Sequence, residues 1–394
     1  EGKNTSNPGE ADPAATPPWT LRDLAESLRH PVRTHFRRRL GIHFDADEGD
    51  TPDEEPFALD GLQRHALLRD ALDELATDPH PQPATVQAWL HRAHRAGRLP
   101  LGAPGQWLQA QLLPTLTQAW TAWQRVSQAS PQAAERLALH WPPAPSLSAP
   151  SAPSAPSARS APQSVTVLDW IDGLHHPDPA SPAWAALCAT WPELSVLGAQ
   201  HTVCRWRDPS RVLKQPLGKT PKADPARLLT VWLRSLALSA TAATPQHAHL
   251  LWVAQDATLL VRPLPRPEAE HTLDRLLAHA AQAQHAPLPL PPRTALALVQ
   301  ARAEAGEDPG THAPPLPLAR LRTAYEGSPD LPGEGQDPYW SRCYPDLDAL
   351  LADGQLVALA PGLWGPLVDW AQQQVAVWPH APNPDDADAP EAHA

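Results

Sequence analysis

The chain has 394 residues, of which 42% are hydrophobic and 51 are proline, and its formal net charge at pH 7 is −12. This length allows two or three domains with a sizeable core, and the negative charge excludes a uniformly basic nucleic-acid-binding protein but not local basic patches. No apolar run reaches the ~18–20 residues of a membrane helix and the three cysteines are scattered, so we expect a cytoplasmic protein with reduced thiols and no membrane partner.

The N-terminal region is predicted to contain a disordered segment followed by two short helices. Residues 1–18 are rich in Gly, Pro, Asn and Glu, a composition that does not build a core. Thr20 can cap a helix with leucines at helical spacing, and Pro31 suits the first turn of a second helix over about residues 32–40. Residues 45–60 hold eight acids and no base, which indicates a solvated loop.

Three longer helices are predicted to follow. Leucines from Leu62 onward mark the first, and Thr85 can cap the second. The third is a Trp- and Leu-rich stretch over residues 106–128, which we expect to be kinked at Pro114. We therefore assign residues 19–141 to a helical part of the protein.

The second half of the chain has a different pattern. Residues 142–163 carry a Ser-Ala-Pro repeat and are predicted to be a linker inserted between elements. Alternating strands and helices over residues 164–378 then predict an α/β core, a mixed sheet flanked by helices. Residues 379–394 form an acidic tail that we expect to be disordered. The strands are predicted at residues 165–174, 201–207, 211–215, 249–254 and 258–263. The helices are predicted at about residues 224–239, 267–284, 294–305, 316–326, 346–353 and 364–377.

Arginines are dense on the second predicted helix. Arg33, Arg37, Arg38 and Arg39 fall within seven residues, and arginines at this density can grip phosphates. The alternative is a solvated helix face whose arginines pair with the acidic run at residues 45–60. Both interpretations stay open on the sequence.

A second group of residues invites comparison with a metal-dependent nuclease. Such enzymes place one acid on a strand, and an acid and a lysine two residues apart on the next strand, so that carboxylates bind Mg²⁺. Asp172 can be the first acid, but the next predicted strand offers Arg205 and Arg207. A guanidinium cannot ligate a cation and repels one, so we expect an ion pair at Asp172 and no metal site.

Other chemistry-bearing patterns are missing. The histidines are scattered and offer no third ligand for zinc. The glycines around Gly327 and Gly333 indicate tight backbone turns. They do not indicate a phosphate-binding loop, because the lysine of such a loop is missing. We therefore predict no catalytic residue, no metal and no cofactor.

Several motifs together resemble one family, the C-terminal domain of the RecC (gamma) subunit of RecBCD-type exodeoxyribonuclease V. The similarity rests on the order and spacing of short motifs over roughly residues 19–375. The motifs are Leu28-Arg29-His30-Pro31-Val32-Arg33, Phe36, Arg39-Leu40, His43-Phe44, Glu55-Pro56-Phe57, Leu59-Asp60-Gly61-Leu62, Gly97-Arg98-Leu99-Pro100, Gly102, Arg205-Trp206-Arg207, Ala324-Tyr325-Glu326-Gly327 and Gly333-Glu334-Gly335.

The resemblance implies a fold of the PD-(D/E)xK restriction-endonuclease-like type without its catalytic residues. Asp172 would align with the first nuclease acid, and Arg205 and Arg207 with the second acid and the lysine, so these three residues would be a vestigial nuclease site. In some related nuclease domains, the helix that corresponds to the opening helix carries cysteines that bind an iron–sulfur cluster. This chain has no cysteine there, so no cluster is expected.

The resemblance also implies a function. We expect a non-catalytic domain that handles DNA and helps to assemble a helicase-nuclease acting in double-strand-break repair and homologous recombination. Its expected partners are RecB-type and RecD-type subunits and duplex and single-stranded DNA. The DNA-binding candidates are Arg33, Arg37, Arg38, Arg205 and Arg207. Two alternatives remain: an active Mg-dependent nuclease that uses Asp172, and an interaction scaffold without DNA contact.

Overall fold

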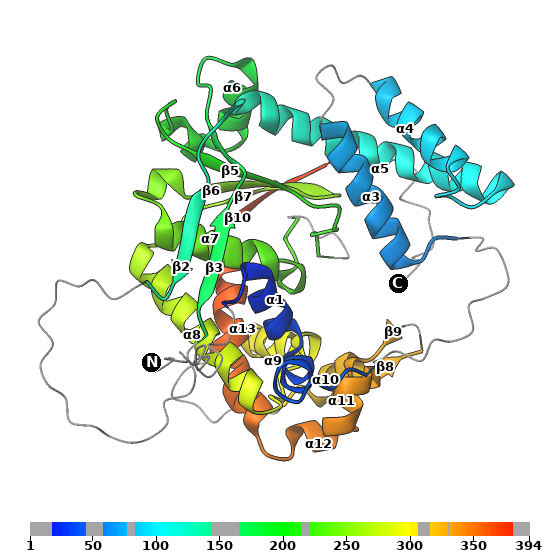
Figure 1. Ribbon diagram of the computed structural model, residues 1–394, viewed down its shortest axis with the longest axis vertical. Helices are drawn as coiled ribbons and strands as arrows, with labels where there is room; N and C mark the ends of the chain where they lie inside the picture. The colour runs from blue at the N-terminus through cyan, green and yellow to red at the C-terminus, as the bar shows by residue number, and fades with distance from the viewer. Residues whose placement is uncertain are drawn as a thin grey trace, which may run out of the picture.

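The computed structural model describes residues 18–44, 58–76, 83–143, 165–214, 221–305, 316–329 and 331–380. Most of the acidic run at residues 45–60, most of the Ser-Ala-Pro segment and residues 381–394 of the predicted C-terminal tail lie outside the described residues, as does nearly all of the expected N-terminal disordered segment. The described part is an α/β protein with a mixed sheet flanked by helices, as predicted (Figure 1).

The main sheet has six strands in the order β1-β4-β5-β6-β7-β10. Neighbouring strands run antiparallel except for the central pair β5 and β6, which is parallel. The strands predicted at residues 249–254 and 258–263 are confirmed as β6 and β7, which form a hairpin around Gln255 and Asp256. The strands are β1 (Gln132–Ala133), β4 (Leu174–His176), β5 (Val203–Arg207), β6 (His249–Val253), β7 (Ala257–Val261) and β10 (Val375–Pro379).

Helices cover both faces of this sheet. One face, with Val203, Leu251 and Leu260, packs against the C-terminal half of α5 (Gly102–Ala129) and against α6 (Pro182–Thr190). The other face packs against α7 (Leu229–Thr241) and α8 (Arg266–His285). Because successive strand residues point to opposite faces, β6 and β7 are buried at every position.

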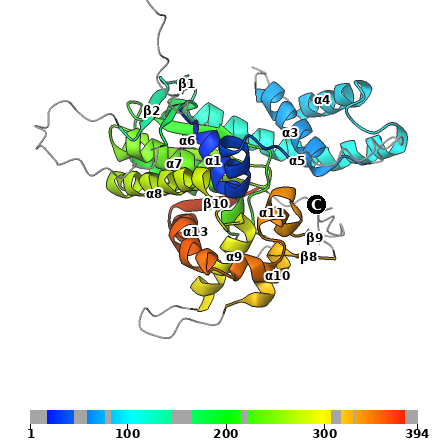
Figure 2. The same ribbon diagram turned by 60° about the horizontal axis from the view of Figure 1, so that its bottom comes forward.

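A helical arm extends from the layered core (Figure 2). It consists of α3 (Gly61–Ala76), α4 (Pro83–Arg95) and the N-terminal half of α5, which enclose a separate apolar cluster. Helix α5 belongs to both parts, since its first half packs in the arm and its second half on the sheet. Pro114, where a kink was predicted, lies inside this helix.

The N-terminal helices pack on the layer formed by α7 and α8. Thr20 is the N-cap of helix α1 (Leu21–Arg29), as the sequence indicated, and it forms a capping box with Asp23. Pro31 opens α2 (Pro31–Thr34), and a π-helical turn, η1 (His35–Arg39), follows it. The backbone of Trp19 pairs with Thr166 and Leu168, which ties this region to β3 (Val167–Ile171).

A two-stranded ribbon and a helical cluster complete the described structure. The ribbon pairs β2 (Leu137–Trp141) with β3 in antiparallel register. The remaining elements are α9 (Pro292–Ala305), α10 (Leu318–Tyr325), α11 (Pro338–Cys343), α12 (Leu347–Leu351), α13 (Gln355–Gln373), the strands β8 (Gly327–Ser328) and β9 (Leu331–Pro332), and the 3₁₀ turns η2 (Pro192–Val196), η3 (Pro225–Arg227), η4 (Pro245–His247) and η5 (Glu334–Gln336).

Several stretches differ from the prediction. The strand predicted at residues 165–174 is divided at Gly173 into β3, in the ribbon, and β4, in the main sheet. Residues 132–141 were expected in the helical part but form β1 and β2, where buried Leu139 and Trp141 alternate with exposed Ala138 and His140. Residues 375–379 are the edge strand β10. Residues 211–215 contain a single bridge between Leu213 and Ala223 where a strand was predicted. Within the described ranges, no helix is both long and apolar enough to cross a membrane.

Candidate functional site

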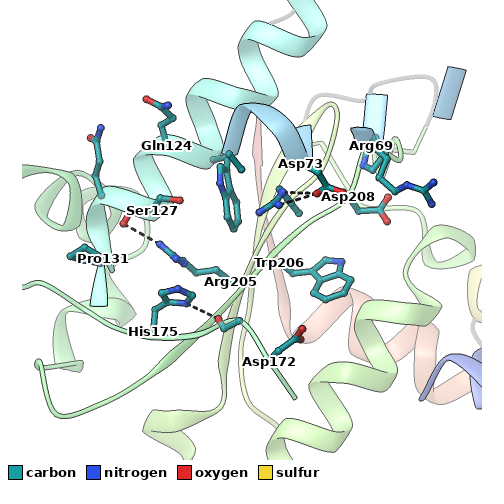
Figure 3. Close-up of a pocket in the computed structure, with 16 residues that line it drawn as sticks. Arg69, Asp73, Gln124, Ser127, Pro131, Asp172, His175, Arg205, Trp206 and Asp208 are labelled. Carbon is teal, nitrogen blue, oxygen red and sulfur yellow. Dashed lines mark hydrogen bonds and ion pairs between the residues drawn. The ribbon is translucent and has the colours of Figure 1, made fainter. Parts of the chain in front are cut away.

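A groove of about 870 Å³ lies between β5 and the helices α3 and α5, where the helical arm meets the sheet (Figure 3). Its lining includes all three residues of the predicted vestigial nuclease site, namely Asp172, Arg205 and Arg207. The helices contribute Asp73 from α3 and Trp123 and Ser127 from α5. The structure thus brings Asp172, Arg205 and Arg207 together at one groove.

Arg205 is a half-buried cation on β5. Its Nη1 donates to the backbone oxygen of Ser127 at 3.1 Å, and its guanidinium lies 5.4 Å from the ring centre of Trp123. Its buried Nε has no hydrogen-bond acceptor, and no carboxylate pairs with this arginine among the described residues. Burial, together with the nearby Arg207, lowers the pKa of Arg205 to about 10. The group is still charged at neutral pH, so an anion in the groove would stabilise it.

Arg207 joins the sheet to the arm. Its Nε and Nη2 both donate to Oδ1 of Asp73, at 3.2 and 2.9 Å. The same guanidinium lies 4.7 Å from the ring centre of Trp123. Arg205 and Arg207 point to the same side of the strand because they are two residues apart, and Trp123 packs against both.

Asp172 lies at the end of β3, next to a sharp bend. Gly173 has a φ of +74°, and a Cβ there would lie 2.5 Å from the backbone oxygen of Arg205, so only glycine fits this crossing. The carboxylate of Asp172 and its backbone oxygen both accept hydrogen bonds from Nη2 of Arg234 on α7. Arg234 is buried, stacks 4.2 Å from the ring centre of Trp206 and donates from Nε to Sγ of Cys204.

This donor set does not fit a divalent metal ion. One oxygen of Asp172 is committed to Arg234, and the two following candidate positions carry cations that repel a metal. The ionised side chains that line the groove are Arg69, Arg205 and Arg207 against Asp73, Asp172 and Asp208. Across the part of the chain that the structure describes, no three His, Cys, Asp or Glu side chains come together as a metal-binding group.

The arginine-rich second helix lies elsewhere, since none of Arg33, Arg37 and Arg38 lines the groove. Arg33 pairs with Asp337 at 3.0 Å, and Nε of Arg37 donates to the hydroxyl of Tyr339 at 3.0 Å. Arg38 pairs with Asp23 at 2.6 Å and stacks over Trp19. One interpretation of the sequence paired these arginines with the acidic run at residues 45–60. The acids that pair with Arg33 and Arg38, Asp337 and Asp23, lie outside that run.

Asp73 and Trp123, which line the groove, were not predicted from the sequence, and neither was Arg234, which does not line it but contacts Asp172. Asp73 and Trp123 come from the helical arm, and no pattern indicated that the arm touches the strand of Arg205. Arg234 did leave a signal, because it is the one charged residue in the apolar helix α7. The buried guanidinium of such an arginine needs an acceptor, and the exposed carboxylate of Asp172 reaches it.

The glycine motifs near residue 330 have a structural role. Gly327 has a φ of +96°, and a Cβ on Gly333 would lie 2.2 Å from the backbone oxygen of Tyr325. Glu334 accepts hydrogen bonds at 2.8 Å from the backbone nitrogens of Arg293 and Thr294, so it caps the first turn of α9. The tight turns that the glycines predicted are thus confirmed.

Comparison with known proteins agrees with the resemblance seen in the sequence. The family model of the RecC C-terminal domain matches residues 16–303, and the chain belongs to this family. The RecBCD enzyme subunit RecC of Escherichia coli (strain K12) is 24% identical over 331 residues, which cover 83% of this chain and 24% of that protein. The chain thus spans about a quarter of the length of this curated relative.

Proposed function

We propose that this chain is a non-catalytic DNA-handling and assembly domain of a RecBCD-type helicase-nuclease, acting in double-strand-break repair and homologous recombination. Its fold would be a nuclease-like fold without catalytic residues, and its partners RecB-type and RecD-type subunits. The observation that carries the proposal is Arg205, a half-buried cation in a groove with no acidic partner among the described residues.

A phosphate group suits this groove better than a metal ion does. Arg205 has an unsatisfied Nε, and a phosphate oxygen is an acceptor that a guanidinium binds strongly. The groove has no large excess of positive charge, because three acids offset the three arginines of its lining. A phosphate at Arg207 would compete with Asp73, whose side chain is 59% exposed.

The salt dependence of DNA binding tests the phosphate role. Forked DNA should bind the full chain, and the double variant Arg205→Ala/Arg207→Ala should weaken binding and reduce the slope of log K against log salt by about 1–2. The matched control is Arg98→Ala, because Arg98 is also ion-paired to an acid on α3 and stacked on a tryptophan, but outside the groove. A slope that the double variant leaves unchanged would contradict phosphate contacts.

Incubation with a metal separates this function from the first alternative, a live nuclease. The purified chain with Mg²⁺ or Mn²⁺ should leave linear and forked DNA intact, since Asp172 is bonded to Arg234 and the neighbouring cations repel the ion. Cleavage that Asp172→Ala abolishes would overturn the non-catalytic assignment.

A crosslinking map of the chain with its partner subunits and DNA tests the second alternative, a scaffold without DNA contact. We expect DNA crosslinks at residues around the groove, for example at a photoreactive group placed at Gln124. Protein crosslinks over the whole domain, with none to DNA, would favour the scaffold.

A further inference from the structure

His175 on β4 lies beside Arg205 in the groove. The two residues are diagonal neighbours on one face of the sheet, because His175 pairs with Val203, two residues before Arg205 on the adjacent strand. Such neighbours have Cα atoms roughly 7–8 Å apart, a gap that one oxyanion can bridge. Figure 3 shows the imidazole next to the guanidinium, and both side chains line the groove.

One backbone oxygen fixes the tautomer of His175. The oxygen of Gly173 accepts a hydrogen bond from the backbone nitrogen of Arg205 at 2.7 Å, and Nδ1 of His175 lies 3.0 Å from the same oxygen. A carbonyl oxygen only accepts, so Nδ1 carries the proton and Nε2 of the neutral ring carries a lone pair. Among the described residues none forms a hydrogen bond with Nε2, which leaves this nitrogen available to a ligand.

The charge of His175 depends on what occupies the groove. Burial and the positive charge of Arg205 lower the pKa of His175, and His176 adds to this effect while the bond to Gly173 opposes it. An anion between the imidazole and the guanidinium offsets the repulsion by Arg205 and favours the imidazolium, whose Nε2 then has a proton to donate.

The elements packed around His175 supply few other charges. The part of α5 that lines the groove and the strand β1, which pairs with β4, present neutral side chains there. The remaining charged groups of the lining are Asp172 at the end of β3, Arg207 and Asp208 at the end of β5, and Arg69 and Asp73 on α3. Arg205 is therefore the one charged group of the lining that lowers the pKa of His175.

We propose that His175 is the second anion contact of the groove and takes up a proton from solvent when a fully ionised oxyanion binds to Arg205. The ligand oxygens accept hydrogen bonds from the unsatisfied Nε of Arg205 and from Nε2 of the imidazolium. A phosphodiester and a free sulfate ion share this chemistry, because neither carries a proton near neutral pH. The inference rests on the proposed function and adds a dependence on pH to the same site.

Sulfate is the probe for this proton uptake, because only protein groups titrate while it binds. The bound state holds more protons than the free state, so the affinity should rise as the pH falls. The affinity of the full chain for sulfate should be about tenfold higher at about pH 5.5 than at about pH 7.5. NMR of chains with labelled histidine measures this affinity, and it should also show the pKa of His175 rising on saturation with sulfate.

Two substitutions of His175 separate its two nitrogens. His175→Gln places an uncharged donor near the position of Nε2, whereas His175→Asn keeps a donor near the position of Nδ1 only. Both variants should bind sulfate with an affinity that no longer depends on pH, and His175→Asn should bind several-fold more weakly than His175→Gln. The matched control is His176→Gln, since His176 lies next in the strand, outside the groove lining, with Nδ1 2.9 Å from the backbone oxygen of His201. This control should keep the pH dependence of the parent chain.

The two proposals fail in different ways. If the parent chain binds sulfate equally well at both pH values, or both His175 variants keep the pH dependence, the role of His175 is overturned and the phosphate role of Arg205 stands. Forked DNA that shows the same pH dependence as sulfate supports His175 as a phosphodiester contact. A pH-dependent affinity for sulfate, together with DNA binding that Arg205→Ala does not weaken, overturns the DNA-handling role of the groove and supports proton uptake with a small anion.

Discussion

Arg234 and Asp172 form the ion pair that fixes the end of β3. The buried guanidinium bonds both the carboxylate and the backbone oxygen of Asp172, while the carboxylate is 70% exposed and lines the groove. The acid that resembles a nuclease ligand therefore has a structural partner on its inner side. This arrangement leaves Arg205 and Arg207 as the groups that define the charge of the β5 side of the groove.

Removing the Asp172 side chain should destabilise the fold. Asp172→Ala leaves Arg234 buried with fewer acceptors, and we expect the free energy of unfolding to fall by about 1–2 kcal/mol, because a hydrogen bond to a charged group is lost but solvent reaches the site. Asp172→Asn keeps an oxygen acceptor and should lose less than half as much. Urea denaturation measures both, and equal losses in the two variants would contradict the hydrogen-bonding role of the carboxylate.

Neutralising Asp73 should strengthen DNA binding. Asp73→Asn releases Arg207 for phosphate, so we expect an affinity for single-stranded DNA several-fold higher, whereas the stability should change by less than about 1 kcal/mol because the pair is solvent-accessible. Asp70→Asn is the matched control, since Asp70 lies on the same helix and pairs with Arg98 outside the groove. An equal gain in DNA affinity for Asp73→Asn and Asp70→Asn would contradict the role of Arg207.

Acid should destabilise the sheet through His249. Burial on β6 lowers the pKa of His249 to about 4, with Glu193 offsetting part of the shift and Arg262 and His201 adding to it. Between its unfolded pKa of 6.5 and about 4, only the unfolded state binds the proton. The free energy of unfolding should therefore fall with pH through this window, by up to about 3 kcal/mol.

Urea denaturation at several pH values checks this linkage. The difference in the free energy of unfolding between the parent chain and His249→Gln should decrease as the pH falls from about 6.5 to about 4. The exposed His271 on α8 is the control, and its replacement by Gln should give a smaller change over the same range. A pH-independent difference for His249→Gln would contradict the lowered pKa.

Adding a methyl group at Gly333 should disrupt the turn after α10. The new Cβ would lie 2.2 Å from the backbone oxygen of Tyr325 and 2.5 Å from the nitrogen of Gly327, so the backbone must move. We expect Gly333→Ala to lower the free energy of unfolding by at least about 1–3 kcal/mol. Gly365→Ala on α13 meets nothing within 4 Å and should be neutral or stabilising by up to about 1 kcal/mol. Equal melting temperatures for the two variants would be inconsistent with this packing.

Local signals predicted much of the fold. Thr20 and Pro31 are residue types that favour the start of a helix, so both helix starts could be predicted locally. A polar pair between two apolar runs likewise indicates the β6–β7 hairpin. The site was predicted in part for the same reason. Asp172 and Arg205 lie on consecutive strand-like runs, and the family motifs indicated that these runs are neighbours.

Other features depend on contacts between distant residues. β1 has two residues, and β10 forms a strand because β7 offers a free edge, so neither is encoded by its own periodicity. The partners of the arginines were equally hidden. Asp337 lies far from Arg33 in the chain and Asp73 far from Arg207, and only packing brings each pair together.

The position of β10 sets the order in which this sheet can be completed. β7 ends at Val261, its neighbour β10 begins at Val375, and the helices α8 to α13 are made between them. While the ribosome synthesises these helices, the apolar strand β7 presents open backbone hydrogen-bonding groups along one side. Until residue 379 has emerged, the nascent protein therefore has an unpaired strand edge at β7. During this interval the edge can pair with a strand of another chain unless something in the cell shields it.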